Sequence, residues 1–197
     1  MNVALKEWSA VIAALDGGLQ IFLLRKGGIV ESKRGFELRH REFLLFPTFE
    51  HQHAQSLKPE SRDLLTGAAE SAESIRISHV ARVAEVLEAP ESLAGMESIY
   101  DRHVWNRDFL RMRYAYRPDL PLYMILVRVR RLDTVRIIPR RPAYAGCKSW
   151  VNLTEEIAVE AGDSVLAEAE FDRRRKDLTS RLGRGRELLE NGEQTPE

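Results

Sequence analysis

The sequence predicts an α+β domain: a small, partly closed β-barrel or curved mixed sheet, with helices packed around it and a long helix near the C-terminus. Hydrophobic residues make up 44% of the 197 residues and charged residues 30%, which is typical of a folded domain. Segments with strand character do not alternate regularly with helical ones, so a doubly wound parallel sheet is not expected. The single cysteine excludes an intramolecular disulfide.

The first element is predicted to be a helix. Leu5, Trp8, Ile12 and Leu15 recur at steps of three and four residues, and Asp16-Gly17-Gly18 would end the helix. The strands expected next are short apolar runs bounded by glycine, proline or polar residues. They span 19–25, 36–38, 43–46 and 75–87. The last of these also fits a helix, but its dense β-branched residues favour a strand.

A short helix is expected from Pro59, and further helices at 90–100 and 106–113. Strands follow at 122–132, 135–138 and 149–153; in the first of these, apolar residues alternate with positions that include Arg128 and Arg130. Asp163 is predicted to cap the final helix. We therefore expect a core domain over 1–155, and a C-terminal helix with a loose tail over 156–197.

The chain shows neither a signal peptide nor an uninterrupted apolar run long enough to span a membrane. These observations predict a cytoplasmic protein without a membrane partner. No pattern calls for a cofactor, so none is expected.

Charge is unevenly distributed although the net charge is +0. Residues 102–148 carry 12 Lys and Arg against 3 Asp, and residues 60–101 carry 3 against 9 acidic residues. The basic block interleaves arginines with aromatic residues between 107 and 117. Guanidinium groups pair with phosphates, and aromatic rings stack on bases. The sequence therefore predicts binding of RNA or DNA, although the same arginines could instead pair with the acidic segments at 60–101 and 155–170.

Three roles are expected in this nucleic-acid site. Phosphate contacts are assigned to Arg25, Lys26, Arg111, Arg113 and Arg117, stacking to Tyr114, Tyr116 and Trp150, and contacts with base edges to Glu50, His51 and Gln52. Lys148, beside Trp150, completes the predicted site.

Several alternatives remain open at the level of sequence. Glu50, His51 and Lys148 could form the centre of a hydrolase acting on nucleic acid or a modified nucleoside. His51 and His53 could bind a metal with Glu50, although no third ligand of another segment is evident. Residues 31–33 with Asp16 superficially match a nuclease triplet. The charged final helix could dock a partner protein or a second copy of the chain.

Four segments carry a resemblance to a known family: LLRKGG at 23–28, FLLFPTFEHQ at 43–52, VWNRDFLRMRYAYRPDLPLY at 104–123 and YAGCKSW at 144–150. With LKEW at 5–8, they resemble the bacterial family called domain of unknown function 1802, over residues 1 to about 153. Occurrence of that family beside restriction-modification genes implies a setting in nucleic-acid defence.

The segment 18–25 is also similar to the opening of ASCH and related PUA-like domains, Gly-x-Lys-x-x-Glu-x-Arg. Gly18 and Arg25 match this pattern, but Gln20 and Leu23 replace its lysine and glutamate. This resemblance implies a small PUA-like barrel that binds RNA or modified bases. Because the lysine is missing, the amidohydrolase activity of some ASCH proteins is not expected.

Overall fold

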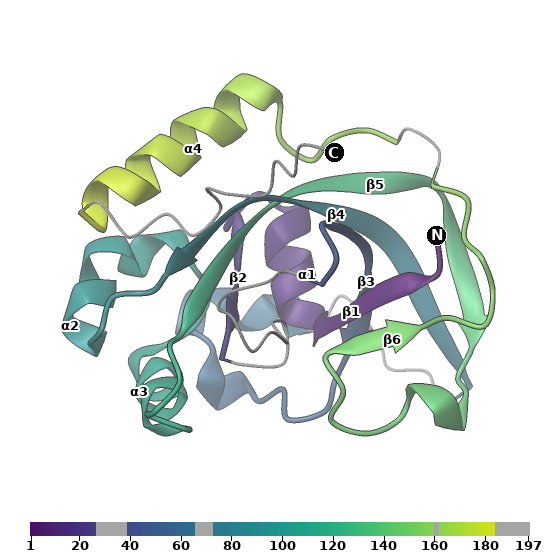
Figure 1. Cartoon of the computed structure of the whole chain (residues 1–197), viewed down its shortest axis with the longest axis horizontal. Coiled ribbons are helices and arrows are strands. Elements are labelled where there is room, and N and C mark those ends of the chain that lie inside the picture. The colour runs from purple at the N-terminus through teal and green to yellow at the C-terminus, as the bar shows by residue number, and fades with distance from the viewer. Residues whose placement is uncertain (27–38, 66–72, 160–161, 184–197) are drawn as a thin grey trace, which may run out of the picture.

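The structure is a computed structural model that describes residues 1–26, 39–65, 73–159 and 162–183. It is a mixed α+β fold built on one six-stranded sheet with the strand order β2-β5-β4-β3-β1-β6. Among the described strands, only β1 and β3 pair in parallel; the other neighbours are antiparallel. The sheet is strongly curved and open rather than a closed barrel (Figure 1). Of the two sheet forms expected, the curved mixed sheet is confirmed.

The predicted first helix is wrong over its first half. Val3–Trp8 forms strand β1, and helix α1 spans only Ser9–Asp16. Residues 4–7 of β1 are all buried, because the strand lies between β3 and β6 and is covered on both faces. A segment without strand alternation, whose apolar residues recur at steps of three and four, is easily taken for a helix. The helix does end at the expected glycines, with Gly18 in the left-handed region at a φ of 64°.

The longest strands form the backbone of the sheet. β4 spans Ser74–Glu88 and β5 spans Tyr123–Pro139, so the strand favoured at 75–87 is confirmed and the two predicted at 122–132 and 135–138 are one. Register shifts between Ile77 and His79 and between Val83 and Glu85 mark irregularities that bend the pair. Both strands arc over α1 (Figure 1).

The remaining strands are short. They are β2 (Phe22–Arg25), β3 (Glu42–Thr48) and β6 (Trp150–Asn152). All three agree with predicted strands, while the strand predicted at 36–38 lies outside the described residues. The opposite edges of the sheet are β2 and β6.

Several short helical elements join the strands, and most of them lie between β3 and β4 or between β4 and β5. The 3-10 helices are η1 (Ala54–Ser56), η2 (Pro59–Leu65), η3 (Glu97–Arg102) and η4 (Pro142–Tyr144), and the α-helices are α2 (Leu93–Met96) and α3 (Arg107–Ala115). The Asn106 side chain accepts a hydrogen bond from the backbone NH of Phe109, which fixes the start of α3.

Helix α4 spans Glu168–Arg181, so the predicted start at Asp163 is wrong. Residues 163–165 instead lie along β5: the Asp163 carbonyl accepts from the NH of Arg131, and the NH of Val165 donates to the carbonyl of Val129. β2 pairs only with residues 123–126 of β5. The segment therefore covers part of a strand edge that β2 leaves open.

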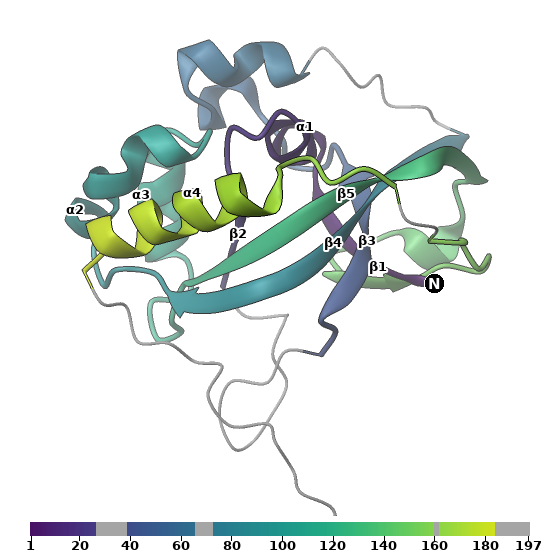
Figure 2. The ribbon, with the colours of Figure 1, turned by 90° about the horizontal axis from the view of Figure 1, so that it is seen from above.

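Two hydrophobic clusters hold the elements together. The larger joins α1, β2 and the first half of β5 to Phe171 and Leu178 of α4, and the smaller fills the far end of the β4–β5 pair. Figure 2 shows α4 lying across the sheet beside α2 and α3. Two apolar side chains of α4 are thus buried in the protein's own core, although the sequence suggests this helix as a docking element. Among the described residues, no helix is long and apolar enough to cross a membrane.

Candidate functional site

A cavity of about 650 Å³ opens where β1, β2 and β3 end beside α3 and the loop 146–149. We call it the basic cleft. Its charged lining consists of five cationic and two acidic side chains: Lys6, Arg25, Lys26, Arg113, Lys148, Glu7 and Glu50. It is the place where most of the predicted site residues meet.

Arg25 and Glu7 form the polar centre of the basic cleft. The Arg25 guanidinium lies 2.7 Å from the Glu7 carboxylate and also donates to the carbonyl of Lys6. Both side chains are largely buried, at 16% and 10% exposure. β1 and β2 are not neighbours in the sheet, so these bonds link two distant parts of its curve. Arg25 therefore holds the cleft in shape, a role the sequence did not predict for it.

Lys6 lies next to this pair on β1. Its ammonium donates to the Gly146 carbonyl at 2.9 Å, which ties the loop 146–149 to the sheet. Burial lowers the pKa of Lys6, and Lys148 adds to this, while Glu50 and Cys147 act in the opposite direction. The side chain thus sits among other charges of the cleft rather than in an apolar core.

Lys26 is buried, and its ammonium donates to the carbonyls of Tyr114 and Arg113 at 2.9 and 3.3 Å. These carbonyls belong to the last turn of α3, where unpaired backbone acceptors attract cations. Lys26 lines the cleft, but its donors already stabilise the helix end.

Arg113 faces the cleft from α3. Burial and the nearby positive charge of Arg25 lower the pKa of Arg113, while Glu7 and Tyr116 raise it. Its guanidinium lies 5.9 Å from the centre of the Tyr116 ring. Tyr116, which directly follows α3, is 54% exposed at the rim, as is Met112 near the end of that helix.

Rings form one wall of the cleft. Trp8 and Trp105 both contact Phe109, with ring centres 5.0 and 5.9 Å apart, and Tyr116 extends the wall outward. Flat apolar rings beside cationic side chains provide the two types of contact that a nucleotide needs.

The segment after β3 divides between two roles. Glu50, His51 and His53 line the cleft, and His51 has a left-handed backbone with a φ of 59°. Gln52 does not line the cleft, and its side-chain oxygen Oε1 accepts a hydrogen bond from the backbone NH of Ala10 at 3.0 Å. Since α1 has no cap from its own preceding residue, Gln52 satisfies an amide of its first turn.

The structure brings together seven of the predicted site residues in the basic cleft: Arg25, Lys26, Glu50, His51, Arg113, Tyr116 and Lys148. Five others do not line it: Gln52, Arg111, Tyr114, Arg117 and Trp150.

These five have other surroundings. Arg111 pairs with Asp108 on the exposed side of α3 at 2.6 Å. The Tyr114 hydroxyl donates to the Pro90 carbonyl, and Trp150 packs edge-on against Phe43. Arg117 is exposed with a φ of 46°. Helical periodicity explains part of the error, because Arg111 and Arg113 are two residues apart on α3 and therefore face different sides.

Internal pairing accounts for much of the basic block. Ion pairs within the described chain neutralise arginines at 102, 107, 128, 130, 131 and 141. The expected pairing with the acidic segments at 60–101 and 155–170 is confirmed for the arginines at 102, 107, 128 and 141. The arginines at 130 and 131 pair instead with Glu42 and Asp16. Arg113 and Lys148 have no ion pair with another described residue.

The metal site and the nuclease site considered from the sequence are not assembled among the described residues. The described residues contain no cluster of three or more His, Cys, Asp or Glu side chains placed to hold a metal ion. Asp16 is occupied by Arg131 at 2.6 Å and His79 at 3.0 Å. The triplet 31–33 lies outside the described residues.

Lys6, Glu7 and Trp8 are the main site residues that the sequence did not indicate. Their signal was available: two adjacent charges stand between Leu5 and Trp8 in a segment otherwise apolar. Assigning the segment to a helix hid it, because a helix would place those charges in solvent.

Searches of curated proteins and of solved structures gave no match. The likeness to ASCH and PUA-like domains thus has no support from comparison and stays a prediction. A family model does match, over residues 4–177, which extends beyond the expected limit near 153 and takes in most of α4. The chain therefore belongs to the family described as Domain of unknown function (DUF1802).

Proposed function

We propose that the basic cleft binds nucleic acid through a single unpaired nucleotide. The observation that carries the proposal is the gathering of five cationic side chains and a wall of aromatic rings in one cavity of about 650 Å³. A cavity of this volume is in the range of small-ligand pockets and does not suit a duplex. Single-stranded or modified RNA or DNA is the expected partner.

Arg113 and Lys148 are the expected phosphate contacts. The other three cations are engaged, since Lys6 and Lys26 donate to backbone carbonyls and Arg25 pairs with Glu7. Neither Arg113 nor Lys148 has a side-chain hydrogen bond or ion pair with another described residue. A phosphate beside Arg113 would also offset its repulsion with Arg25, which contributes to its lowered pKa.

The aromatic wall provides the expected base contact. Stacking on a ring contributes about 1–3 kcal/mol per base and tolerates any sequence. Tyr116 is the accessible ring, and Glu50 and His51 lie in the same cavity as acceptors or donors for a base edge. These assignments retain the predicted roles of Tyr116, Glu50 and His51.

The test is binding of labelled single-stranded RNA, single-stranded DNA and duplex DNA over a salt series. Arg113→Ala/Lys148→Ala should weaken binding and reduce the slope of log K against log salt by about 1 for each phosphate that the variant cannot bind. Arg111→Ala/Arg117→Ala removes the same net charge from residues that do not line the cleft. Equal losses of affinity in both double variants, or no binding to any probe at low salt, would refute the proposal.

We also propose a distant relationship to PUA-like domains and a role in bacterial nucleic-acid defence or RNA processing. The resemblance of residues 18–25 and the curved sheet support the first. The genomic setting of the family supports the second. An experimentally determined structure that superposes on a PUA-like barrel would support the first, and identification of the nucleic acids that copurify with the protein would test the second.

A hydrolase acting on nucleic acid or a modified nucleoside is the second candidate. It is favoured by one observation: Glu50, His51 and Lys148, from two distant segments, line the same cavity. Incubating the protein with labelled oligonucleotides and modified nucleosides, with Glu50→Gln as the control, tests it. Turnover that disappears in that variant would support the hydrolase; binding without turnover would leave the binding function alone.

A further inference from the structure

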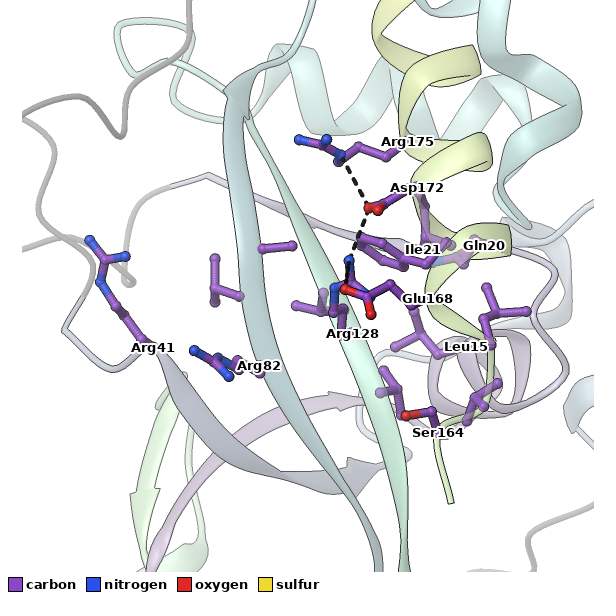
Figure 3. A pocket seen from close by; sticks show the side chains of 17 residues that line it. Leu15, Gln20, Ile21, Arg41, Arg82, Arg128, Ser164, Glu168, Asp172 and Arg175 are labelled. Carbon is purple, nitrogen blue, oxygen red and sulfur yellow. Dashed lines mark hydrogen bonds and ion pairs between the residues drawn. The ribbon is translucent and has the colours of Figure 1, made fainter. Parts of the chain in front are cut away.

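A second cavity, of about 670 Å³, lies between α4 and the outer side of β4 and β5. We call it the α4 cleft. Its lining includes apolar residues, among them Ile21, Val127 and Phe171, which we call the apolar floor. Four arginines from four segments also line it: Arg41, Arg82, Arg128 and Arg175 (Figure 3). None of these residues contributes to the basic cleft.

Helix α4 neutralises one side of the α4 cleft. Arg128 lies 2.9 Å from Asp172 and 3.6 Å from Glu168. Arg175 pairs with Glu85 at 3.3 Å and lies 3.8 Å from Asp172. Figure 3 shows the contacts of α4 as dashed lines on this side of β4.

The other side of the cleft keeps its charge. Arg82 stands directly opposite Arg128 in the β4–β5 register, an arrangement of like charges that ordinarily destabilises a sheet. Glu42 is the β3 residue opposite Arg82, but its carboxylate pairs with Arg130 at 3.3 Å. Within the part of the chain that the structure describes, Arg82 has no ion pair.

Arg41 adds a second unneutralised charge. Its carbonyl accepts a hydrogen bond from the NH of Val83 at 2.8 Å, which fixes Arg41 beside Arg82 across the β3–β4 pair. The described residues include no ion-pair partner for Arg41 either. The two exposed side chains leave neighbouring backbone positions and extend in different directions in Figure 3, so both guanidinium groups would have to turn toward one anion to bind it. Beside the apolar floor, they suit an anion that also has an apolar or heterocyclic part.

We propose that the α4 cleft is a phosphate-binding site, in which Arg41 and Arg82 hold the phosphate group and the apolar floor receives the body of the ligand. The ligand class is a phosphate ester bearing a heterocycle, either a free nucleotide or a nucleotide unit of a nucleic-acid strand. The site shares no residue with the basic cleft, so it stands whether or not that cleft binds nucleic acid.

The test uses thermal unfolding with inorganic phosphate, deoxyadenosine monophosphate and a short single-stranded DNA as separate probes. Each is titrated into the wild type and into Arg113→Ala/Lys148→Ala, which removes the phosphate contacts proposed for the basic cleft. The monophosphate should stabilise both proteins, because a ligand that binds the folded state raises its stability. Binding of the DNA strand alone would identify the nucleic-acid backbone as the source of the phosphate.

Arg41→Gln/Arg82→Gln should weaken this binding by about tenfold or more, because charge-assisted hydrogen bonds to phosphate are removed. Arg76→Gln, an exposed position of β4 outside the cleft, should bind as the wild type does. Without ligand, the double variant should unfold at the same or a higher temperature, since a like-charge contact is relieved. That outcome separates a binding role from a structural one.

Two results would overturn the proposal. One is the absence of stabilisation by all three probes. The other is unchanged binding in Arg41→Gln/Arg82→Gln; if binding instead disappeared in Arg113→Ala/Lys148→Ala, the phosphate site would belong to the basic cleft and the function proposed for that cleft would stand alone.

Discussion

Arg25 shows how one side chain can connect the fold to the site. Its guanidinium joins β2 to two groups of β1, the Glu7 carboxylate and the Lys6 carbonyl. A buried ion pair adds little net stability compared with apolar residues, but loss of one member leaves a buried charge without a partner. The pair is therefore expected to matter more for the shape of the cleft than for the total stability of the fold.

Arg25→Ala should lower the free energy of unfolding by about 3–5 kcal/mol, because the Glu7 carboxylate stays buried without its partner. Urea denaturation measures the change. Arg111→Ala is the control, since it removes an arginine whose ion pair with Asp108 is exposed to solvent. Equal effects of the two substitutions would show that the Arg25 pair is not a buried interaction.

His103 provides a prediction on pH. It is buried among Phe22, Tyr100 and Trp105, and burial, with a smaller effect of Lys58, lowers its pKa to about 3. The unfolded chain binds a proton on this residue below about pH 6.5, whereas the folded protein does not. The contribution of neutral His103 to the free energy of unfolding is therefore fully present above about pH 6.5. It decreases as the pH falls from there toward 3.

His103→Phe should remove this contribution. Relative to the variant, the wild type should lose about 1.4 kcal/mol of unfolding free energy per pH unit over that acidic range. Urea denaturation at a series of pH values gives both curves, and their difference cancels the other titrating groups. Parallel curves would mean that His103 titrates normally in the folded protein.

At the scale of elements, the end of α1 depends on a particular glycine. Gly18 has a φ of 64°, and a Cβ there would lie 3.0 Å from Leu166 Cδ2. Gly17, one residue earlier, has a φ of −78°, and a Cβ there would meet its nearest neighbour at 3.4 Å. The two adjacent glycines thus differ in backbone conformation and in space.

Gly18→Ala should destabilise the protein by about 1–2 kcal/mol through backbone strain, with crowding against Leu166 adding to it. Gly17→Ala should be neutral or stabilise by about 0.4–1 kcal/mol, because it restricts the unfolded chain at no cost in strain. Thermal or urea unfolding of the pair measures the difference. The reverse order would contradict the left-handed conformation of Gly18.

At the scale of the whole molecule, α4 is joined to the rest of the chain through the larger hydrophobic cluster. Phe171 and Leu178 are almost fully buried, and ion pairs to Arg102 and Arg128 connect the helix to η3 and β5. Sequence alone predicts a division into a core over 1–155 and a separate C-terminal helix. The extent of the burial favours unfolding of both as one unit.

We expect a single cooperative transition in which α4 and the sheet unfold together. The three tryptophans lie outside α4 and report on the sheet region, while a fluorophore on Ser180→Cys, in a Cys147→Ser background, reports on α4. The two signals should give the same midpoint in urea. An earlier transition of the label would establish α4 as an independently unfolding element.

Charge also acts at this scale. The net charge of +0 hides a basic block whose arginines are mostly paired with acidic residues of distant segments. Composition alone predicts a basic surface from such a block. The structure pairs most of these arginines and leaves Arg113 and Lys148 of the block in the basic cleft, because ion pairing follows three-dimensional proximity rather than position in the chain.

Much of this protein could be predicted from local patterns in its sequence. These features are the mixed α+β class, most strands, the start of α3, the glycine end of α1 and the family. It also identified seven residues that share the basic cleft. These features depend on neighbouring residues, on propensity, capping and alternation, all of which can be read along the chain. Such local features do not predict structure that depends on contacts between distant segments.

Tertiary structure decided the rest. β1 is a strand because β3 and β6 cover it, and residues 163–165 are extended because the edge of β5 is free there. Only the folded chain places Lys6 and Glu7 beside Arg25 and turns Gln52 toward α1. It also leaves Arg41 and Arg82 without acidic partners among the residues that the structure describes. Each outcome depends on which groups meet across the curved sheet, and pairing between distant segments is not encoded in any short stretch of sequence.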